Sequence, residues 1–390
     1  MWTTIPNAGT NPRGANETTT TASFWLRDTE AFSYTGKIGL GDVDFSAYKQ
    51  MLYAVNLNDR QLYAIPVIAP VTPGGAPTAG SPTAIPLPLA LPGAATGCNI
   101  VWVRPFALET QLNKVYAGLT CTGPATSDLR VYVYQMDADT QIFGSAPAFE
   151  STLTGYARGS SKNDGVLNTL ATWNPWEDAT QHVQSGSGQN RTSWSQPLFS
   201  DLVFDNNGDL ILAIRDRNGD QTGHTSLTID PANNNFVDGI GAGDLLRACV
   251  DAAGGWTMES AGKCGGQTGY STNNNLGPGG GEFYNDKAPS QHDQTALGSV
   301  MVVPGYAEAV ATMYDPAAVS SQEGYRKLSD TNGSDTGDTV LTQNPGGPAA
   351  SEDKDGTYGK SAGLGDIEPL LPFAPIELGN RVWTDANSNG

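Results

Sequence analysis

The chain has 390 residues, enough for one large domain or two to three ordinary ones, and its hydrophobic fraction of 38% allows a buried core. Glycine (47 residues) and proline (25 residues) are abundant, which favours short strands joined by turns and predicts an all-β protein. Forty acidic against 21 basic residues give a net charge of −19, which argues against binding to nucleic acid or to anionic membranes.

The N-terminus, Met1-Trp2-Thr3-Thr4, carries neither the basic nor the apolar region of a signal peptide. No apolar run in the sequence approaches the ~18–20 residues of a membrane span. We therefore expect a mature or trimmed fragment that does not insert into a membrane.

A short plan then recurs along the chain. Residues 39–55 form an alternating strand, a polar turn and a second, more apolar strand, and residues 104–119 repeat this order. Residues 200–214 repeat it again, with Asn206-Asn207-Gly208 at the turn, and residues 297–313 make a fourth copy. Each copy predicts a β-hairpin.

Further strands follow the hairpins, "RQLYAIPV" after the first and "LRVYVYQMD" after the second. A hairpin with one or two added antiparallel strands is typical of a β-propeller blade, so residues 1–372 are predicted to form a propeller of five to seven blades. "GLGDIEPL", residues 363–370, repeats the opening of the first copy. We expect an N-terminal strand at residues 22–28 to complete this last unit and close the ring, which leaves no open sheet edge.

Long polar or proline-rich stretches separate these strands. We expect them to be loops on the propeller faces, with local disorder as the alternative. They are residues 66–97, 160–195, 225–235, 265–281 and 329–360.

Four cysteines occur, none of them in a CxxC pair, and only three histidines are scattered along the chain, which disfavours a structural zinc site. Two local disulfides, Cys98–Cys121 and Cys249–Cys264, are the economical pairing, and four buried free thiols are the alternative. Disulfides would place the protein in an oxidising compartment, and each would stabilise the fold by ~3 kcal/mol.

The last residues, "IELGNRVWTDANSNG" at 376–390, resemble the start of the B-type repeat of serine–aspartate-repeat (Sdr-type) surface proteins. That repeat is a prealbumin-like β-sandwich with a calcium loop, so residues 373–390 are expected to be a linker and the first strand of a truncated repeat. Residues 23–370 resemble the propeller-like region found ahead of such repeats in large secreted bacterial proteins. The resemblance implies cell-surface display and adhesion.

Aspartates open the first strand of three units, at Asp42, Asp201 and Asp366, and Arg104 and Ser299 fall near that place in two others. First strands line a propeller's channel, where three carboxylates would repel one another unless a calcium or magnesium ion, or Arg104, compensates. The alternative, which we favour, is that each aspartate accepts hydrogen bonds from nearby backbone N–H groups.

Other acidic clusters resemble parts of calcium loops. Asp216, Asn218 and Asp220 alternate around a glycine but lack the final bidentate Glu, whereas residues 205–209 are interpreted as a hairpin turn. A further site or a solvated loop is predicted at Asp330, Asp335 and Asp338. The strongest candidates by motif, left incomplete by the truncation, are Asp385, Asn387 and Asn389.

Catalysis is a separate hypothesis. Some five-bladed propellers hydrolyse glycosides with paired acids, and here the candidates are Asp42, Asp201, Glu282 and Glu368. Three tryptophans could stack on sugar rings or could instead pin the loops onto the disc: Trp173, Trp176 and Trp194. The sequence contains no G-x-S-x-G, H-E-x-x-H or P-loop motif.

These patterns together predict the extracellular binding or adhesion head of a modular bacterial surface or secreted protein. We expect its partner to be a glycan or protein matrix at the cell surface, and calcium to stiffen its acidic loops. The alternatives are a glycoside hydrolase and a structural component of a surface filament or layer.

Overall fold

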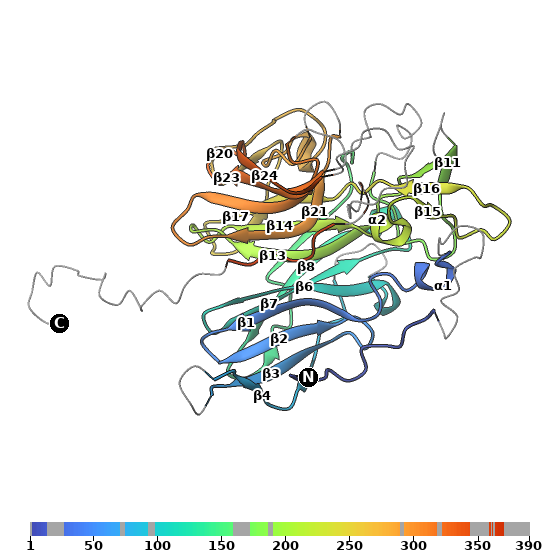
Figure 1. The fold of residues 1–390 in the computed structure, drawn as a ribbon. Helices are drawn as coiled ribbons and strands as arrows, with labels where there is room; N and C mark the ends of the chain where they lie inside the picture. The colour runs from blue at the N-terminus through green and yellow to red at the C-terminus, as the bar shows by residue number, and fades with distance from the viewer. Residues whose placement is uncertain are drawn as a thin grey trace, which may run out of the picture.

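The computed structural model describes residues 2–13, 27–70, 75–92, 98–158, 172–185, 190–288, 292–317, 322–343, 359, 361 and 363–369. Within these residues the protein is all-β, as predicted. Four antiparallel sheets of four or five strands follow one another in chain order from the blue N-terminal end to the orange end (Figure 1). Two short helices, α1 (Thr29–Phe32) and α2 (Arg217–Thr222), accompany them.

The first sheet consists of β1 (Leu40–Ser46), β2 (Met51–Asn56), β3 (Gln61–Ile68), β4 (Thr78–Ala79) and β5 (Thr83–Pro86). The second consists of β6 (Val103–Gln111), β7 (Lys114–Cys121), β8 (Arg130–Asp137), β9 (Ile142–Phe143) and β10 (Phe149–Thr152). In both sheets the strands that follow the first hairpin pair outward from it.

The third sheet runs β13 (Pro197–Phe204), β14 (Leu210–Asp216), β17 (Asp244–Val250) and β18 (Trp256–Met258). The fourth runs β21 (Ala296–Val302), β22 (Glu308–Tyr314), β23 (Gln322–Ser329) and β24 (Asp335–Gln343). All four hairpins predicted from the repeats are therefore present, each at the start of its own sheet.

Smaller elements lie between the four sheets. A side sheet near α2 has the order β11 (Val183–Ser185), β12 (Asn190–Thr192), β16 (Phe236–Gly239) and β15 (Ser226–Leu227). A two-stranded ribbon joins β19 (Lys263–Cys264) to β20 (Gln267–Thr268). Single 3-10 turns occur at Ile100–Trp102, Thr126–Asp128 and Pro278–Gly280.

The first strand of every sheet carries a register shift at a corresponding place, near the start of the strand. A bulge of this kind bends the strand and re-aims its side chains. The shifts lie between Leu40 and Val43, Pro105 and Leu108, Phe199 and Asp201, and Ala296 and Val300. The repeated plan in the sequence thus corresponds to a repeated local structure.

The core lies between consecutive sheets. Strand β1 contacts β6, β6 contacts β13 and β13 contacts β21, so the four first strands lie side by side at the centre (Figure 1). One cluster of buried apolar residues joins the first sheet to the second, another the second to the third, and a third the third to the fourth. Burial of apolar surface at about 25 cal/mol per Å² thus holds the sheets in an arc.

Several sequence predictions need correction. All five stretches that were expected to be loops contain strands: β4 and β5 lie in 66–97, β11 and β12 in 160–195, β15 in 225–235 and β20 in 265–281. In the fifth, 329–360, β24 occupies Asp335–Gln343 as the outer strand of the fourth sheet. Of the proposed closing strand at 22–28, the described residues Arg27 and Asp28 lie elsewhere: Arg27 donates to the carbonyls of the turn at 228–233. Residues 363–369 contain no assigned strand.

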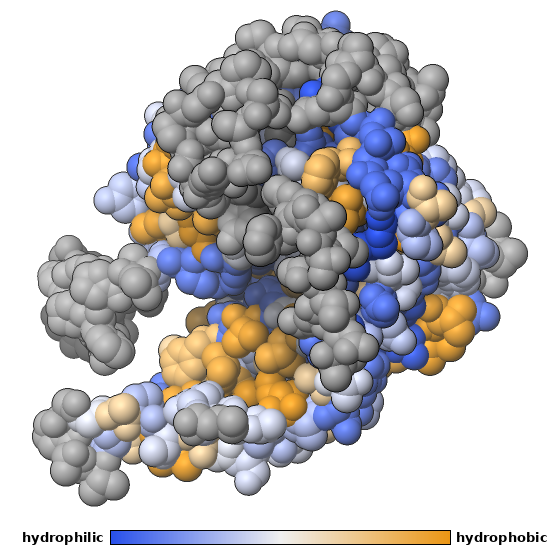
Figure 2. All heavy atoms as spheres, turned by 45° about the vertical axis from the view of Figure 1, so that its right-hand side comes forward, coloured by the Kyte–Doolittle hydropathy of each residue, from blue (hydrophilic) through white to orange (hydrophobic). Residues whose placement is uncertain are grey.

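Apolar side chains are exposed along β1 and in the turn after it, at Leu40, Val43, Phe45 and Tyr48. Figure 2 shows apolar surface gathered at a hollow in one face of the molecule. Within the described residues no helix is both long and apolar enough to cross a bilayer.

Candidate functional site

Three predicted aspartates meet around the central strands. The Asp42 carboxylate on β1 accepts a hydrogen bond from the backbone N–H of Leu108 on β6 at 2.8 Å. The Asp201 carboxylate on β13 accepts one from the N–H of Val300 on β21 at 2.7 Å. Each aspartate therefore ties the first strand of its sheet to the first strand of the next.

The segment 363–369 continues this arrangement beyond β21. Ser299 on β21 donates its hydroxyl to Asp366 at 2.7 Å and accepts the N–H of Ile367 at 2.8 Å. Ser299 thus takes the place that an aspartate holds in β1 and β13. The segments "GLGDVDFS" and "GLGDIEPL" were predicted to be equivalent. In the structure their aspartates, Asp42 and Asp366, lie close enough for their charges to interact.

Six acidic side chains surround this centre, and we call them the hub carboxylates: Asp42, Asp44, Glu109, Asp201, Asp366 and Glu368. Burial raises the pKa of Asp42 and of Asp201 well above the usual range, and neighbouring hub carboxylates raise both further. Burial and the charges of Asp366 and Asp44 raise the pKa of Glu368, whose outer part is exposed, to about 7. Like charges held close together favour protonation in this way.

Arg104 does not compensate these charges. Its guanidinium donates to the carbonyl of Val103 and lies 5.7 Å from the ring centre of Trp176, away from the hub carboxylates. The geometry of Asp42 and Asp201 instead matches the alternative in which the aspartates bind backbone N–H groups.

A second carboxylate cluster lies between the third and fourth sheets. Among the described residues it alone brings three acidic side chains within 4.8 Å of one another: Asp244, Glu282 and Asp286. All three are buried. Of them the sequence had singled out only Glu282, although "GDLL" at 243–246 repeats the glycine-aspartate opening of other units.

Donors already engage this cluster. Arg158 donates to Asp244 at 2.7 Å, and Gln294 donates to Glu282 and, at 3.3 Å, to Asp286. Burial raises the pKa of Glu282 to about 8, with the Asp244 charge adding to the shift, so Glu282 is mostly protonated at neutral pH. Burial and the Glu282 charge raise the pKa of Asp286 well above its usual range.

The predicted calcium loop at 216–220 is a helix start. Asp216 caps α2: its carboxylate accepts the N–H groups of Asn218 at 3.0 Å and Gln196 at 2.9 Å. Asn218 donates to the Thr192 carbonyl, and Asp220 pairs with Arg215 at 2.5 Å. The contacts of Asp216 and Asp220 use carboxylate oxygens that a cation would need, whereas Asn218 is held through its amide nitrogen.

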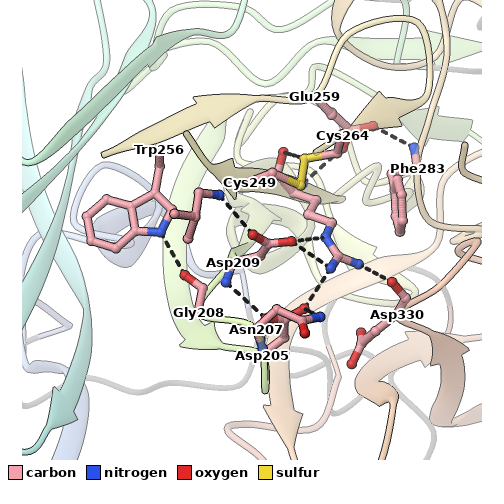
Figure 3. The surroundings of a disulfide bond; sticks show 12 residues. Asp205, Asn207, Gly208, Asp209, Cys249, Trp256, Glu259, Cys264, Phe283 and Asp330 are labelled. Carbon is pink, nitrogen blue, oxygen red and sulfur yellow. Dashed lines mark hydrogen bonds and ion pairs between the residues drawn. A yellow bond between two sulfur atoms is a disulfide. The ribbon is translucent and has the colours of Figure 1, made fainter. Parts of the chain in front are cut away.

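The turn at 205–209 is the hairpin that was predicted, and its acids bind an arginine. Arg247 on β17 pairs with Asp205 at 2.6 Å and Asp209 at 2.8 Å, and donates to the Asp330 carbonyl at 2.5 Å. Figure 3 shows these three acidic residues gathered beside the Cys249–Cys264 disulfide. Both predicted disulfides are formed, Cys98–Cys121 being the other.

The remaining predicted metal ligands are also engaged or lie outside the described part of the chain. Asp330 accepts a hydrogen bond from Tyr284, while Asp335 and Asp338 pair with Arg326 across β23 and β24. Outside the described residues lie Asp385, Asn387 and Asn389.

The tryptophans proposed for sugar stacking are mostly buried. Trp173 is 1% exposed beneath the Arg158 guanidinium, and Trp176 is 6% exposed with its indole N–H bound to the Pro197 carbonyl. Trp194 is half-buried and stacks on His182 at 3.7 Å. Trp173 and Trp176 therefore pin loops to the sheets and present no free ring face.

Comparison with known proteins finds no matching family model. Three relatives in Dictyostelium discoideum are similar: Colossin-A at 32% identity over 310 residues, Colossin-B at 29% over 310 and Colossin-C at 28% over 376. The matches cover 74%, 74% and 91% of this chain, but only 2%, 7% and 32% of the respective relatives.

Among solved structures, a crystal structure of a protein from Lactobacillus plantarum matches with a TM-score of 0.34 and 10% identity. The match covers 78% of this chain and 54% of that protein.

Proposed function

We propose that the chain is the extracellular binding head of a modular cell-surface or secreted protein, recognising a glycan or protein matrix. The observation that carries the proposal is the use of Asp42 and Asp201 as braces between sheets, which makes the central carboxylates part of a rigid scaffold. The two disulfides support an oxidising, extracellular setting. Similarity to small parts of much longer relatives supports a modular protein.

We infer that the arc of four sheets is part of a β-propeller, with the extended segment 363–369 in the place of the inner strand of a fifth blade. Support comes from the four first strands side by side and from Ser299, which binds this segment as the aspartates bind the next strand. A propeller presents loops on two faces, which suits a binding head.

The test is retention of the purified chain on wells coated with polysaccharide or with fibrous matrix protein. Saturable retention on one coating, without release of reducing ends, is expected. Absence of retention on every coating would contradict a binding head, and ordered filaments seen by electron microscopy at neutral pH would favour the structural alternative.

Calcium stays part of the proposal as a structural ion. Asp244, Glu282 and Asp286 offer hard oxygen ligands that suit it, although a cation there would displace the donors from Arg158 and Gln294. A Tm that rises with calcium and falls with chelator is expected, and a Tm indifferent to both would remove the ion from the proposal.

A glycoside hydrolase is the second candidate, and Glu368 is the observation that favours it. Its pKa of about 7 suits a general acid at neutral pH, beside the carboxylates of Asp366 and Asp44. Release of reducing ends from polysaccharide that is lost in Glu368→Gln would support this candidate, and no release from a broad panel would exclude it.

A further inference from the structure

Arg60 and Arg104 are two arginines for which the described part of the chain offers no carboxylate in contact. Arg60, in the turn between β2 and β3, donates to the Ile100 carbonyl, and Arg104, on β6, donates to the Val103 carbonyl at 2.8 Å. Neither forms an ion pair with any residue that the structure describes. Each side chain is half-buried, and the only hydrogen-bond acceptors that each guanidinium contacts among the described residues are backbone carbonyls.

Arg104 has the greater unused capacity to donate. Its Nε is buried and has no hydrogen-bond partner, and among described residues its Nη2 has none either. Burial and the charge of Arg60 lower its pKa to about 10, so it remains a cation at neutral pH. Nε is shielded from solvent, so Nη2 carries the unused donors that an oxyanion can reach at the end of this planar guanidinium.

Cations and aromatic rings surround this guanidinium. Burial lowers the pKa of Lys37, and the charges of Arg217 and Arg104 lower it further. The Lys37 ammonium pairs with Asp178, which also pairs with Arg217 at 2.8 Å. The Trp176 ring lies 4.2 Å from the Arg217 guanidinium and 5.7 Å from that of Arg104. Asp178 thus forms ion pairs with Lys37 and Arg217, and it acts on Arg104 only through its charge, without an ion pair.

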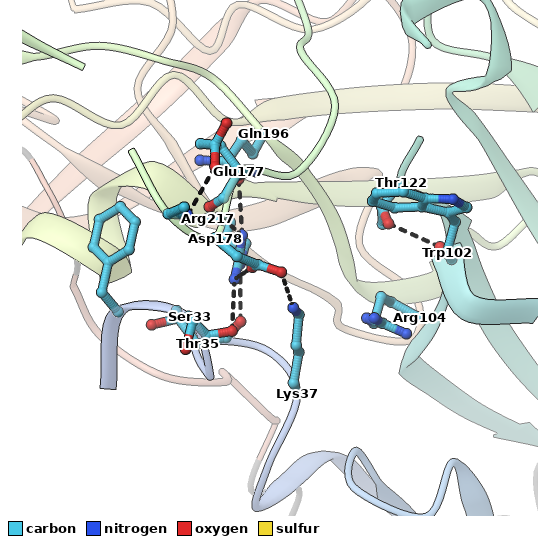
Figure 4. A network of polar contacts seen from close by, with 12 residues as sticks. Ser33, Thr35, Lys37, Trp102, Arg104, Thr122, Glu177, Asp178, Gln196 and Arg217 are labelled. Carbon is cyan, nitrogen blue, oxygen red and sulfur yellow. Dashed lines mark hydrogen bonds and ion pairs between the residues drawn. The ribbon is translucent and has the colours of Figure 1, made fainter. Parts of the chain in front are cut away.

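Trp102 is the second tryptophan near Arg104. Its ring is half-buried and packs partly against the core cluster that joins the first two sheets, and its indole N–H makes no hydrogen bond within the described part of the chain. Figure 4 shows the Arg104 guanidinium with the head of Lys37 on one side and the Trp102 ring on the other. An aromatic ring next to an arginine fork is a combination that binds a ring carrying an anionic group.

We propose that Arg104, Lys37, Arg60 and Trp102 form a binding site for an acidic saccharide, whose carboxylate or sulfate group pairs with Arg104 while its ring lies against Trp102. The inference rests on the proposed binding function and names its ligand class. A bound oxyanion would supply the opposite charge that the described residues around Arg104 lack.

The site also explains how a chain with a net charge of −19 can bind an acidic ligand. Long-range repulsion slows such an encounter, but it is screened beyond about 8–10 Å at physiological salt. The charges that act on Arg104 are those of the cations Arg60 and Arg217 and of the acid Asp178, so cations outnumber acids at the guanidinium itself. Two further acids, Glu177 and Asp220, act on Arg217.

The test is isothermal titration of the full chain with three probes: a trigalacturonate, a sulfated galactose oligosaccharide and neutral galactotriose. At least one acidic probe is expected to bind more tightly than the neutral one, with an affinity that falls as salt rises. The acidic probe that binds identifies carboxylate or sulfate as the preferred group.

The decisive variant is Arg104→Met, which keeps the aliphatic stem and removes the fork. Acidic-probe affinity is expected to fall at least tenfold, while the Tm stays equal or rises because an unpaired charge is removed. The matched control is Arg130→Met: Arg130 is on β8 of the same sheet, also has a buried unpartnered Nε, but is paired with Glu150 at 3.8 Å. Arg130→Met is expected to leave acidic-probe affinity unchanged.

Equal affinity of Arg104→Met and the unmodified chain, or no preference for either acidic probe, would overturn the inference. Matrix retention measured in parallel separates the two proposals. Retention without acidic-probe binding would remove this site and leave the binding head, whereas loss of all retention would remove the proposed function itself.

Discussion

At the scale of single residues, buried arginines hold the sheets together. Arg247 has no exposed side-chain surface and joins β17 to the turn at 205–209 and to the Asp330 carbonyl of the fourth sheet. Its guanidinium also lies 4.6 Å from the ring of Phe283. A buried ion pair of this kind adds little relative to an apolar replacement of the whole group, but removing one partner leaves an uncompensated charge.

Arg247→Met is therefore expected to destabilise the fold by about 3–5 kcal/mol, because Asp205 stays buried without its partner. The measurement is the midpoint of urea unfolding. Arg130→Met, which breaks the half-exposed pair with Glu150, is the control and is expected to cost less than about 1 kcal/mol. Equal midpoints for the two variants would show that Arg247 is not a structural centre.

Local residue patterns predicted local contacts well and distant ones poorly. The pairs Cys98–Cys121 and Cys249–Cys264, and the turn at 205–209, involve residues near one another in sequence, and all were predicted correctly. The pairing of Arg247 with Asp205 spans 42 residues and depends on how strands pack, which periodicity does not encode. The prediction that Arg104 compensates the channel aspartates failed for the same reason. The repeat gives the position of Arg104 in its strand but not the direction of its side chain.

At the scale of elements, the aspartate braces set the spacing of neighbouring first strands. Asp42 and Asp201 perform the same task in two sheets, each accepting the N–H of a residue just beyond the partner strand's register shift. The repeat in the sequence predicted that these acids are equivalent. It did not predict β24, where Asp335 and Asp338 are held in a strand by pairing with Arg326 on β23.

Two substitutions separate the hydrogen bond that Asp201 accepts from the effect of its negative charge. Asp201→Asn keeps an oxygen that accepts the Val300 N–H and removes repulsion with Asp42, so stability at pH 7 is expected to be equal or higher. Asp201→Ala leaves that N–H without a partner and is expected to cost about 1–3 kcal/mol. Thermal unfolding of both variants checks this, and equal losses in the two would show that the charge itself is required.

At the scale of the whole molecule, the chain buries acids whose pKa lies above the usual range. Burial is the first cause at Asp42, Asp201, Glu259 and Asp286, and it raises the pKa of Glu282 to about 8. In the unfolded chain these groups release their protons near pH 4 to 4.5. At any pH between these unfolded values and the raised pKa values of the folded state, the folded protein binds more protons than the unfolded chain does.

The free energy of unfolding changes with pH in proportion to the number of protons bound by the unfolded chain minus the number bound by the folded protein. This difference is negative here, so stability is expected to fall as the pH rises from about 4.5 towards 8. One such group contributes a slope of about 1.4 kcal/mol per pH unit at most. Below about pH 4 the sign reverses, because the unfolded chain takes up protons at carboxyls such as Asp137, whose pKa in the folded protein is lowered to about 2 by the backbone N–H of Thr140 and by Lys114. The maximum is expected near pH 4 to 5.

Urea unfolding at half-unit steps from pH 3 to 9 measures this profile, and Glu282→Gln isolates one group. This variant cannot ionise at the position where burial and Asp244 disfavour a charge, so it is expected to flatten the profile between pH 5 and 8. Its gain over the unmodified chain should be largest at pH 8 and vanish below pH 4.5, where Glu282 is protonated in both states. A calcium ion bound by Asp244, Glu282 and Asp286 would reverse this order, since Glu282→Gln would then lose stability at pH 8 only when calcium is present.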